Sequence, residues 1–333
     1  MFSFKRFSKD ELEYVIHNAS VETGIAEVVI EKDYWVSFVL NYLFSQCEWS
    51  EYFTFKGGTS LSKCFGLIER FSEDIDLILD WRLLGYSNSE PWEERSKNQQ
   101  VKFNEQVNKQ TAEFLVQYFV PRMTLDFKNY ILDDFAVDLD DEDPQTVVFT
   151  YPSNYESFYI AQNVRMEIGS LAAWTPAKII GIQPDIKSVY PQLFEGENID
   201  VRTVLPERTF WEKATILHHE AHRPENSKLP DRYARHYYDM YCLAKSTYKA
   251  KAFADKELLE KVVRFKEKFY PRGWARYEEA VPKTIRLVPD AYRLKEIKAD
   301  YNSMEEMFFC KIPEFDEIIQ GLADLEKEIH SLK

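Results

Sequence analysis

The sequence reads Tyr52-Phe53-Thr54-Phe55-Lys56-Gly57-Gly58-Thr59-Ser60 and then, a few residues on, Ser72-Glu73-Asp74-Ile75-Asp76-Leu77. The first run is short and apolar and ends at a pair of glycines, which is typical of a strand followed by a turn. Residues 60–65 then have the pattern of a helix, and residues 74–79 have that of a second strand. The order of strand, glycine turn, helix and strand predicts a core that mixes helices and strands.

Acidic and apolar side chains alternate in the second of these strands. Because successive side chains of a strand point to opposite faces, Asp74 and Asp76 share one face, while Ile75, Leu77 and Leu79 share the other. Mg²⁺ takes one or two carboxylates together with phosphate oxygens. Such a site can activate an attacking hydroxyl and neutralise a leaving pyrophosphate. The acid pair therefore predicts a site for Mg²⁺ or Mn²⁺.

The glycine pair predicts a phosphate site in the same region. A turn without Cβ atoms lets phosphate oxygens approach backbone N–H groups at the start of the next helix. Thr59 or Ser60 can cap that helix and contact a phosphate. The sequence has no Gly-x-x-x-x-Gly-Lys-Ser/Thr pattern, which disfavours a P-loop ATPase.

The rest of the sequence divides near residue 200 into a mixed half and a helical half. Apolar residues at helical spacing predict helices over 9–46, 99–119, 206–222, 229–246, 254–269 and 314–331. Extended segments are predicted over 124–132, 146–151 and 163–168, and the acidic residues 138–143 predict a turn in preference to a metal site. We therefore expect one domain over residues 1–200 and a helical domain over residues 201–333.

The composition is that of a folded globular protein. Hydrophobic residues make up 45% and aromatic residues 15% of the 333 residues, which argues against a disordered chain. The formal net charge of −14 argues against a protein that coats nucleic acid, although a local basic face could hold an RNA. We expect reduced thiols, because the cysteines are far apart and lack zinc-ligand spacing: Cys47, Cys64, Cys242 and Cys310.

The sequence contains no signal for membrane insertion. Its first residues lack the charged start and the long apolar run of a signal peptide. No later apolar stretch approaches the roughly 20 residues that a membrane-spanning helix needs. We expect a soluble, cytoplasmic protein that does not bind a membrane.

Motifs along nearly the whole chain carry a family resemblance. They are Glu31-Lys32-Asp33-Tyr34-Trp35, Lys56-Gly57-Gly58-Thr59, Arg70-Phe71-Ser72-Glu73-Asp74-Ile75-Asp76-Leu77, Glu207-Arg208-Thr209-Phe210-Trp211-Glu212-Lys213, Arg235-His236-Tyr237-Tyr238-Asp239-Met240-Tyr241, and Asp300-Tyr301 with Met304 and Met307. In this order they resemble the nucleotidyltransferases of the AbiEii abortive-infection toxin group, which belong to the wider DNA polymerase β-like superfamily. Several motifs in one order are more specific than any single motif.

The resemblance implies the fold and a third metal ligand. The implied fold is α+β and bilobed, with a small mixed nucleotidyltransferase sheet flanked by helices and with a helical C-terminal domain. Such enzymes use a third acid on a neighbouring strand, and the segment from Val164 to Ile168 offers Glu167 beside Asp74 and Asp76 as metal ligands. The alternative is a surface Glu167 paired with Arg165.

The resemblance also implies which residues hold the nucleotide. Lys213 would bind the triphosphate, unless it lies on the solvated face of a helix. Asp239 would orient Lys213 or a nearby arginine, unless it forms a purely structural salt bridge. The predicted catalytic residues are Asp74, Asp76, Glu167, Lys213 and Asp239. The predicted nucleotide-binding residues are Lys56, Gly57, Gly58, Thr59, Ser60, Arg70, Ser72 and Lys213.

The implied activity is transfer of a nucleoside monophosphate from an NTP to an acceptor. By resemblance the chain is the toxin of a toxin–antitoxin or phage-defence pair, its acceptor is the 3′ end of tRNA, and its antitoxin is a separate transcriptional regulator encoded nearby. One alternative is a nucleotidyltransferase that modifies a protein or a small molecule. Another is a catalytically silent binding module of the same fold.

Two further clusters have more than one interpretation. His218 and His222 lie four residues apart and share a helix face, but no third ligand is evident, so ordinary helix histidines are favoured over zinc. Lysine and arginine alternate with aromatic residues over 261–276, which fits either contact with RNA or packing of a helix.

Overall fold

We describe the chain from a computed structural model that covers residues 2–72, 74–157, 160–308 and 312–332. Glu73 of the acidic motif and Cys310 lie outside these ranges. By its internal contacts the chain forms two compact units. The first, the sheet unit, comprises residues 1–64 and 73–203, and the second, the helical unit, comprises residues 65–72 and 204–333. None of the described helices combines the length and apolar character needed to cross a bilayer.

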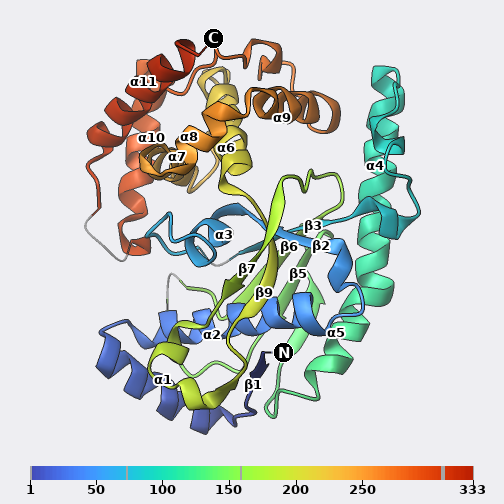
Figure 1. Cartoon of the computed structure of the whole chain (residues 1–333), viewed down its shortest axis with the longest axis vertical. Coiled ribbons are helices and arrows are strands. Elements are labelled where there is room, and N and C mark those ends of the chain that lie inside the picture. The colour runs from blue at the N-terminus through green and yellow to red at the C-terminus, as the bar shows by residue number, and fades with distance from the viewer. Residues whose placement is uncertain (1, 73, 158–159, 309–311, 333) are drawn as a thin grey trace. The chain divides into compact units, whose positions relative to one another are not determined.

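A mixed sheet of seven strands is the centre of the sheet unit (Figure 1). Its order is β4-β5-β6-β3-β2-β9-β7, so β3 is the middle strand, and it pairs antiparallel with β2 and parallel with β6. A separate pair joins β1 (Ser3–Phe4) to β8 (Phe194–Glu195). The strands of the sheet are β2 (Phe53–Lys56), β3 (Ile75–Leu79), β4 (Ala136–Leu139), β5 (Thr146–Thr150), β6 (Asn163–Gly169), β7 (Ala177–Ile182) and β9 (Ile199–Val204).

Helices flank this sheet, and their ends follow from local sequence. Ser8 caps α1 in a reciprocal arrangement with Glu11, and Gly24 ends it in the left-handed conformation. In α2 most residues from Ile30 to Asn41 are buried, because this helix is the central element of the core beside the sheet. The helices of the sheet unit are α1 (Lys9–Thr23), α2 (Glu27–Asn41), α3 (Gly57–Lys63), α4 (Lys97–Phe114) and α5 (Val120–Phe127).

The prediction of an extended segment over residues 124–132 is wrong. Residues 120–127 form α5, which continues α4 through the π-helical turn Leu115–Phe119, and Pro121 is the second residue after that turn. The buried side chains are Phe119, Met123 and Phe127, each four residues from the next, which is helical spacing. The Phe127 ring packs 4.9 Å from that of Phe149 on β5, so α5 is part of the core.

The helical unit consists mainly of helices. It also contains an isolated antiparallel β-bridge between Arg70 and Phe308. The predicted helix over 229–246 begins only at Arg235, because residues 231–234 form a turn. The Asp300 carboxylate stabilises this turn by accepting from the Arg232 and Ala234 N–H groups, both at 2.7 Å. Two helices, α8 and α10, were not predicted. The helices are α6 (Pro206–Ala221), α7 (Arg235–Lys245), α8 (Tyr248–Ala254), α9 (Lys256–Phe269), α10 (Ala291–Ser303) and α11 (Phe315–His330).

The predicted fold class is confirmed. The chain is α+β, its mixed sheet is flanked by helices, and the residues after 204 that the structure describes form a helical unit. Residues 65–72 are the part of the N-terminal sequence that joins the helical unit.

Candidate active site

The carboxylate of Asp76 lies against the first residue of α3. Lys56, at the end of β2, pairs with Asp76 across the antiparallel strands, and Gly57 follows with φ of +82°. A Cβ atom built on Gly57 would lie 1.8 Å from Asp76 Oδ2 and 2.6 Å from its Cγ. Any side chain at position 57 would therefore displace the carboxylate, and the backbone conformation also favours glycine.

Hydrogen bonds tie the glycine turn to the other acid of the pair. The Thr59 hydroxyl donates to the Asp74 carbonyl oxygen at 2.6 Å, and the Ser60 hydroxyl donates to the Gly57 carbonyl at 2.8 Å. Because α3 begins at Gly57, Thr59 and Ser60 lie inside the helix, and the prediction that one of them caps it is wrong. The Lys56 residue occupies the cap position, and the N–H groups of the first helical residues have no carbonyl partner within the helix.

Glu167 on β6 lies directly beside Asp76. The parallel register of β3 and β6 pairs these two residues, and adjacent strands are about 4.8 Å apart. Along β6, Val164, Met166 and Ile168 are buried while Glu167 is exposed, so Glu167 shares the open face of the sheet with Asp76. The fold thus brings an acid from each of two neighbouring strands together.

Arg165 belongs to the same face as these acids. Its guanidinium donates to the Asp140 carboxylate at 2.7 Å, so its ion pair is with the turn between β4 and β5. Burial opposes the charged form, but Asp140 and, more weakly, Asp74 and Glu167 raise the pKa of Arg165. The turn predicted over 138–143 lies there, as the end of β4 and the loop to β5.

The donor set on this face suits a hard cation. Two carboxylates in register plus Asp74 provide oxygen ligands, and Mg²⁺ needs only one or two carboxylates when phosphate oxygens complete its shell. Within the described ranges, no group of three or more His, Cys, Asp or Glu side chains is gathered closely enough to hold a metal by itself. A metal ion at this face would therefore need further ligands, such as phosphate oxygens.

A second charged cluster lies in the helical unit around Asp239. The Arg70 guanidinium donates to both Asp239 oxygens, at 2.7 and 2.8 Å, and the Lys213 ammonium donates to Oδ2 at 2.7 Å. The Lys213 ammonium also donates to His236 Nδ1 at 2.9 Å. Asp239 is fully buried, and Arg70 and Lys213 are 3% and 7% exposed. Helix α6 supplies Lys213, while α7 supplies both His236 and Asp239, three residues apart on one face.

This cluster, which we call the Asp239 cluster, carries a net positive charge. Burial opposes ionisation, but Arg70 and Lys213 hold the pKa of Asp239 well below its ordinary value. Burial, followed by the charges of Lys213 and Arg235, lowers the pKa of His236 well below 6.5, so its ring is neutral. Burial and Arg70 lower the pKa of Lys213 from 10.5. Two cations and one anion leave one positive charge, which suits a phosphate.

The remaining predicted nucleotide-binding residues lie near Gly57 or Asp74 in the sequence, or belong to the Asp239 cluster. Lys56 ends β2, and Gly58 is the second residue of α3. Arg70 also donates to the Phe71 carbonyl at 3.1 Å, so its N–H groups serve protein acceptors, and it acts on the Asp239 cluster as a positioning residue. Ser72 is half-buried at the end of residues 65–72.

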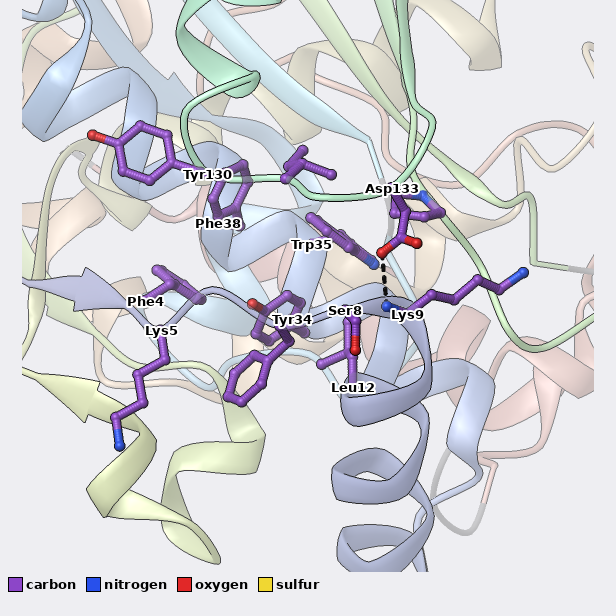
Figure 2. A pocket seen from close by; sticks show the side chains of 13 residues that line it. Phe4, Lys5, Ser8, Lys9, Leu12, Tyr34, Trp35, Phe38, Tyr130 and Asp133 are labelled. Carbon is purple, nitrogen blue, oxygen red and sulfur yellow. Dashed lines mark hydrogen bonds between the residues drawn. The ribbon is translucent and has the colours of Figure 1, made fainter.

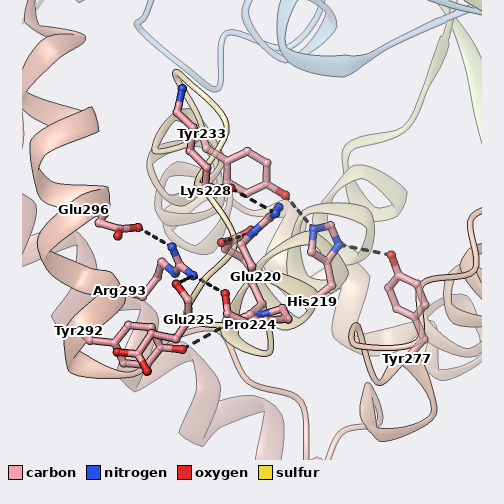
Figure 3. A network of polar contacts seen from close by, with 11 residues as sticks. His219, Glu220, Pro224, Glu225, Lys228, Tyr233, Tyr277, Tyr292, Arg293 and Glu296 are labelled. Carbon is pink, nitrogen blue, oxygen red and sulfur yellow. Dashed lines mark hydrogen bonds and ion pairs between the residues drawn. The ribbon is translucent and has the colours of Figure 1, made fainter.

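Histidines 218 and 219 are buried parts of the helical unit. His218 Nε2 donates to the Arg276 carbonyl at 2.9 Å, its Nδ1 accepts from the Arg286 N–H at 3.0 Å, and burial lowers its pKa to about 4. His219 lies 2.9 Å from the Tyr233 hydroxyl and 3.3 Å from that of Tyr277 (Figure 3). Both rings thus use both nitrogens within the protein.

Two aromatic residues of the basic segment are buried in the core. Phe265 and Phe269 of α9 are 6% and 4% exposed, which fits packing of the helix and leaves neither ring open to a base. Tyr270 is 45% exposed, and Arg272 lies 5.8 Å from the Trp274 ring.

The motif over residues 31–35 fixes elements of the sheet unit. Glu31 accepts from the Ser153 hydroxyl and the Asn154 N–H, Lys32 donates to the Ala161 and Asn163 carbonyls, and Asp33 pairs with Lys63 at the end of α3. Tyr34 and Trp35 line a cavity of about 20 Å³ (Figure 2). That volume holds about one water molecule.

His236 and Asp300 are the residues that sequence reasoning did not single out. Both lie in motifs quoted above, and His236 is three residues before Asp239, a spacing that places two side chains on one face of a helix. Local sequence patterns could not predict the hydrogen bonds from residues 232 and 234 to Asp300, because these partners are more than 60 residues apart.

Comparisons with known proteins show the family of the chain. The chain is similar to the nucleotidyltransferase toxin MenT4 of Mycobacterium tuberculosis H37Rv, with 15% identity over 96% of this chain and 97% of that one and a TM-score of 0.46. It is also similar to a nucleotidyltransferase from H. pylori, with 13% identity over 92% of this chain and 96% of that one and a TM-score of 0.43. No curated protein sequence matches it. A family model described as the nucleotidyl transferase AbiEii toxin of type IV toxin–antitoxin systems matches residues 39–321, and the chain therefore belongs to this family.

Proposed function

We propose that this toxin transfers a nucleoside monophosphate from an NTP to the 3′ end of tRNA, and that the reaction depends on Mg²⁺ or Mn²⁺. The observation that carries the proposal is the contact between Asp76 and Gly57. It joins an acid that can hold a metal to the turn whose N–H groups can meet phosphate oxygens. Membership of a nucleotidyltransferase family supports the class of reaction.

Three carboxylates of the sheet unit form the metal site in this proposal. Asp74, Asp76 and Glu167 would hold the ion, which would make the acceptor hydroxyl a stronger nucleophile and offset the charge of the departing pyrophosphate. The register that pairs Asp76 with Glu167 supports the choice of Glu167 as third acid.

The remaining residues bind and orient the NTP. Gly57 and Gly58 let phosphate oxygens reach the backbone, with Lys56, Thr59, Ser60 and Ser72 around them as predicted from the sequence. Lys213 donates to a phosphate oxygen, and Asp239 fixes the direction of its ammonium. The acceptor oxygen then forms a bond to the α-phosphorus, the bond from that phosphorus to the bridging oxygen breaks, and pyrophosphate leaves.

The family supports the proposed partner, and the resemblance of the sequence motifs supports the proposed acceptor. A type IV toxin has an antitoxin, and we place its gene nearby, in a system that arrests growth or blocks phage. The tRNA acceptor is assigned by the resemblance stated above, and tRNA and NTPs place the reaction in the cytoplasm. A protein or a small molecule is the second candidate acceptor, because the same metal site serves either.

The test is a transfer assay with separate α-³²P-labelled ATP, GTP, CTP and UTP, Mg²⁺ and total RNA. We expect label in RNA of tRNA size with the wild type and with Asp141→Asn, an exposed acid of the β4–β5 turn, but not with Asp76→Asn. Label confined to protein or to small soluble products would reject the tRNA acceptor. No transfer together with no NTP binding would favour a silent binding module.

A further inference from the structure

We infer that His236 is a further positioning residue of nucleotidyl transfer, which aims the Lys213 ammonium at a phosphate by accepting one of its hydrogens at Nδ1. The inference rests on the proposed role of Lys213 in binding the triphosphate. His236 is part of the motif from Arg235 to Tyr241, but neither its sequence nor the family match assigns it a role.

The geometry restricts the ammonium from two sides. Lys213 Nζ lies 2.7 Å from Asp239 Oδ2 and 2.9 Å from His236 Nδ1. An ammonium has three N–H donors, and a lysine side chain is flexible unless its head is held. With two donors committed to polar partners of the described chain, the tetrahedral geometry fixes the direction of the third. A single acceptor would leave the ammonium free to rotate about one hydrogen bond.

The imidazole itself is held in place. It lies on the same face of α7 as Asp239, and the Tyr233 ring packs edge-on against it with centroids 4.7 Å apart. Asp300 accepts from the Arg232 and Ala234 N–H groups just before α7 begins, so the first turn of the helix is anchored. The acceptor atom is therefore positioned before any substrate arrives, and no ordering of His236 opposes binding.

The charges around His236 keep the ring able to accept. The charged groups that face it are Lys213 on α6, Arg235 and Asp239 on α7, and Arg70 of residues 65–72. Three of these four are cations, and with burial they lower the pKa of His236, so Nδ1 is unprotonated and Nε2 carries the hydrogen. A protonated ring would present a donor to Lys213 and repel it. Acidification therefore removes the acceptor.

The test combines two substitutions with a matched control. His236→Ala removes the acceptor, and His236→Asn restores one, because the asparagine amide oxygen occupies the place of Nδ1 and does not titrate near neutral pH. His222→Ala is the control, since this partly buried histidine of the same unit donates to the His218 carbonyl and lies 3.8 Å from the Glu279 carboxylate. Rates are measured with the four labelled NTPs and total RNA, over a range of NTP concentrations and from about pH 5 to pH 8.

We expect kcat/KM for His236→Ala to fall about tenfold or more, because a buried donor then lacks its partner. His236→Asn should recover most of this loss, and His222→Ala should match the wild type. Wild-type rates for His236→Ala would overturn the inference. An inactive but folded His236→Asn would do the same, because it would show that the ring and not its acceptor matters.

A spectroscopic measurement separates this inference from the proposed function. Nitrogen-15 NMR of labelled histidine in the full chain, without substrate, should show His236 with an unprotonated Nδ1 and a protonated Nε2 near neutral pH, and Lys213→Met should shift the Nδ1 signal. A protonated Nδ1 would overturn the inference even in an inactive protein. A wild type that neither binds nor transfers NTP, with the expected spectrum, would reject the proposed function alone.

Discussion

The carboxylate of Asp76 occupies the space that a side chain at Gly57 would need. A methyl group at Gly57 would lie 1.8 Å from Asp76 Oδ2, well inside any permitted contact. The strand that carries Asp76 and the start of α3 are thus closely packed against each other. Substitution at either residue disturbs the other.

Gly57→Ala should reduce transfer about a hundredfold or more, because it displaces the Asp76 carboxylate by roughly an ångström. It should also cost about 1–2 kcal/mol of stability through its positive φ. Gly24→Ala is the matched control, since Gly24 has φ of +74° and open space around its Cα. Equal activity of the two variants in the labelled-NTP assay would refute the importance of the contact.

Glu167→Gln should raise the Mg²⁺ concentration needed for half-maximal transfer roughly tenfold, because a charged ligand beside Asp76 is lost. The measurement is a Mg²⁺ titration of the initial rate. Glu142→Gln, in the exposed β4–β5 turn, is the control and should leave the titration unchanged. An unchanged titration for Glu167→Gln would assign the third ligand to another residue.

Asp239→Asn should destabilise the fold by about 3–5 kcal/mol, because it leaves the buried charges of Arg70 and Lys213 without their anion. The free energy of unfolding in urea gives this loss. Glu257→Gln breaks the surface pair with Lys261 and should cost far less. If both variants lose equally little stability, the Asp239 cluster does not carry the charges assigned to it.

NTP affinity should decline on the alkaline side at a pH below that expected of an ordinary lysine. Phosphate binding needs charged Lys213, and its charge is lost as the pH rises through a pKa that burial and Arg70 lower from 10.5. Equilibrium binding of labelled NTP between about pH 7 and pH 10 measures the decline. Lys213→Arg should bind more weakly but without this decline, because arginine stays charged. An identical decline in Lys213→Arg would assign it to another group.

Local signals in the sequence predicted the elements around Asp76. The alternation from Asp74 to Leu79 and the glycine pair each depend on neighbours in the chain. The structure contains β3 within one residue of the expected strand, whereas α3 begins three residues before the expected helix and includes both glycines. Apolar spacing likewise predicted α1, α2, α4 and α6. The prediction of an extended segment over 124–132 overlooked the spacing of Phe119, Met123 and Phe127, which fits a helix.

Long-range pairings could be predicted only in part. The choice of Glu167 needed a neighbouring strand, and only the register of β6 shows that it lies beside Asp76. The sequence predicted that Asp239 pairs with Lys213 or an arginine. It did not predict that Asp239 binds both Arg70 and Lys213, or that Lys213 contacts His236, because these contacts depend on the packing of segments more than 20 residues apart. Their roles in binding the nucleotide remain predictions.

The most direct test is a crystal structure with Mn²⁺ and a non-hydrolysable NTP analogue, in which anomalous scattering locates the metal. We predict an anomalous peak about 2.1 Å from carboxylate oxygens of Asp74 and Asp76, with phosphate oxygens near the N–H groups of Gly57 and Gly58. A metal and a triphosphate bound away from both aspartates would contradict the account.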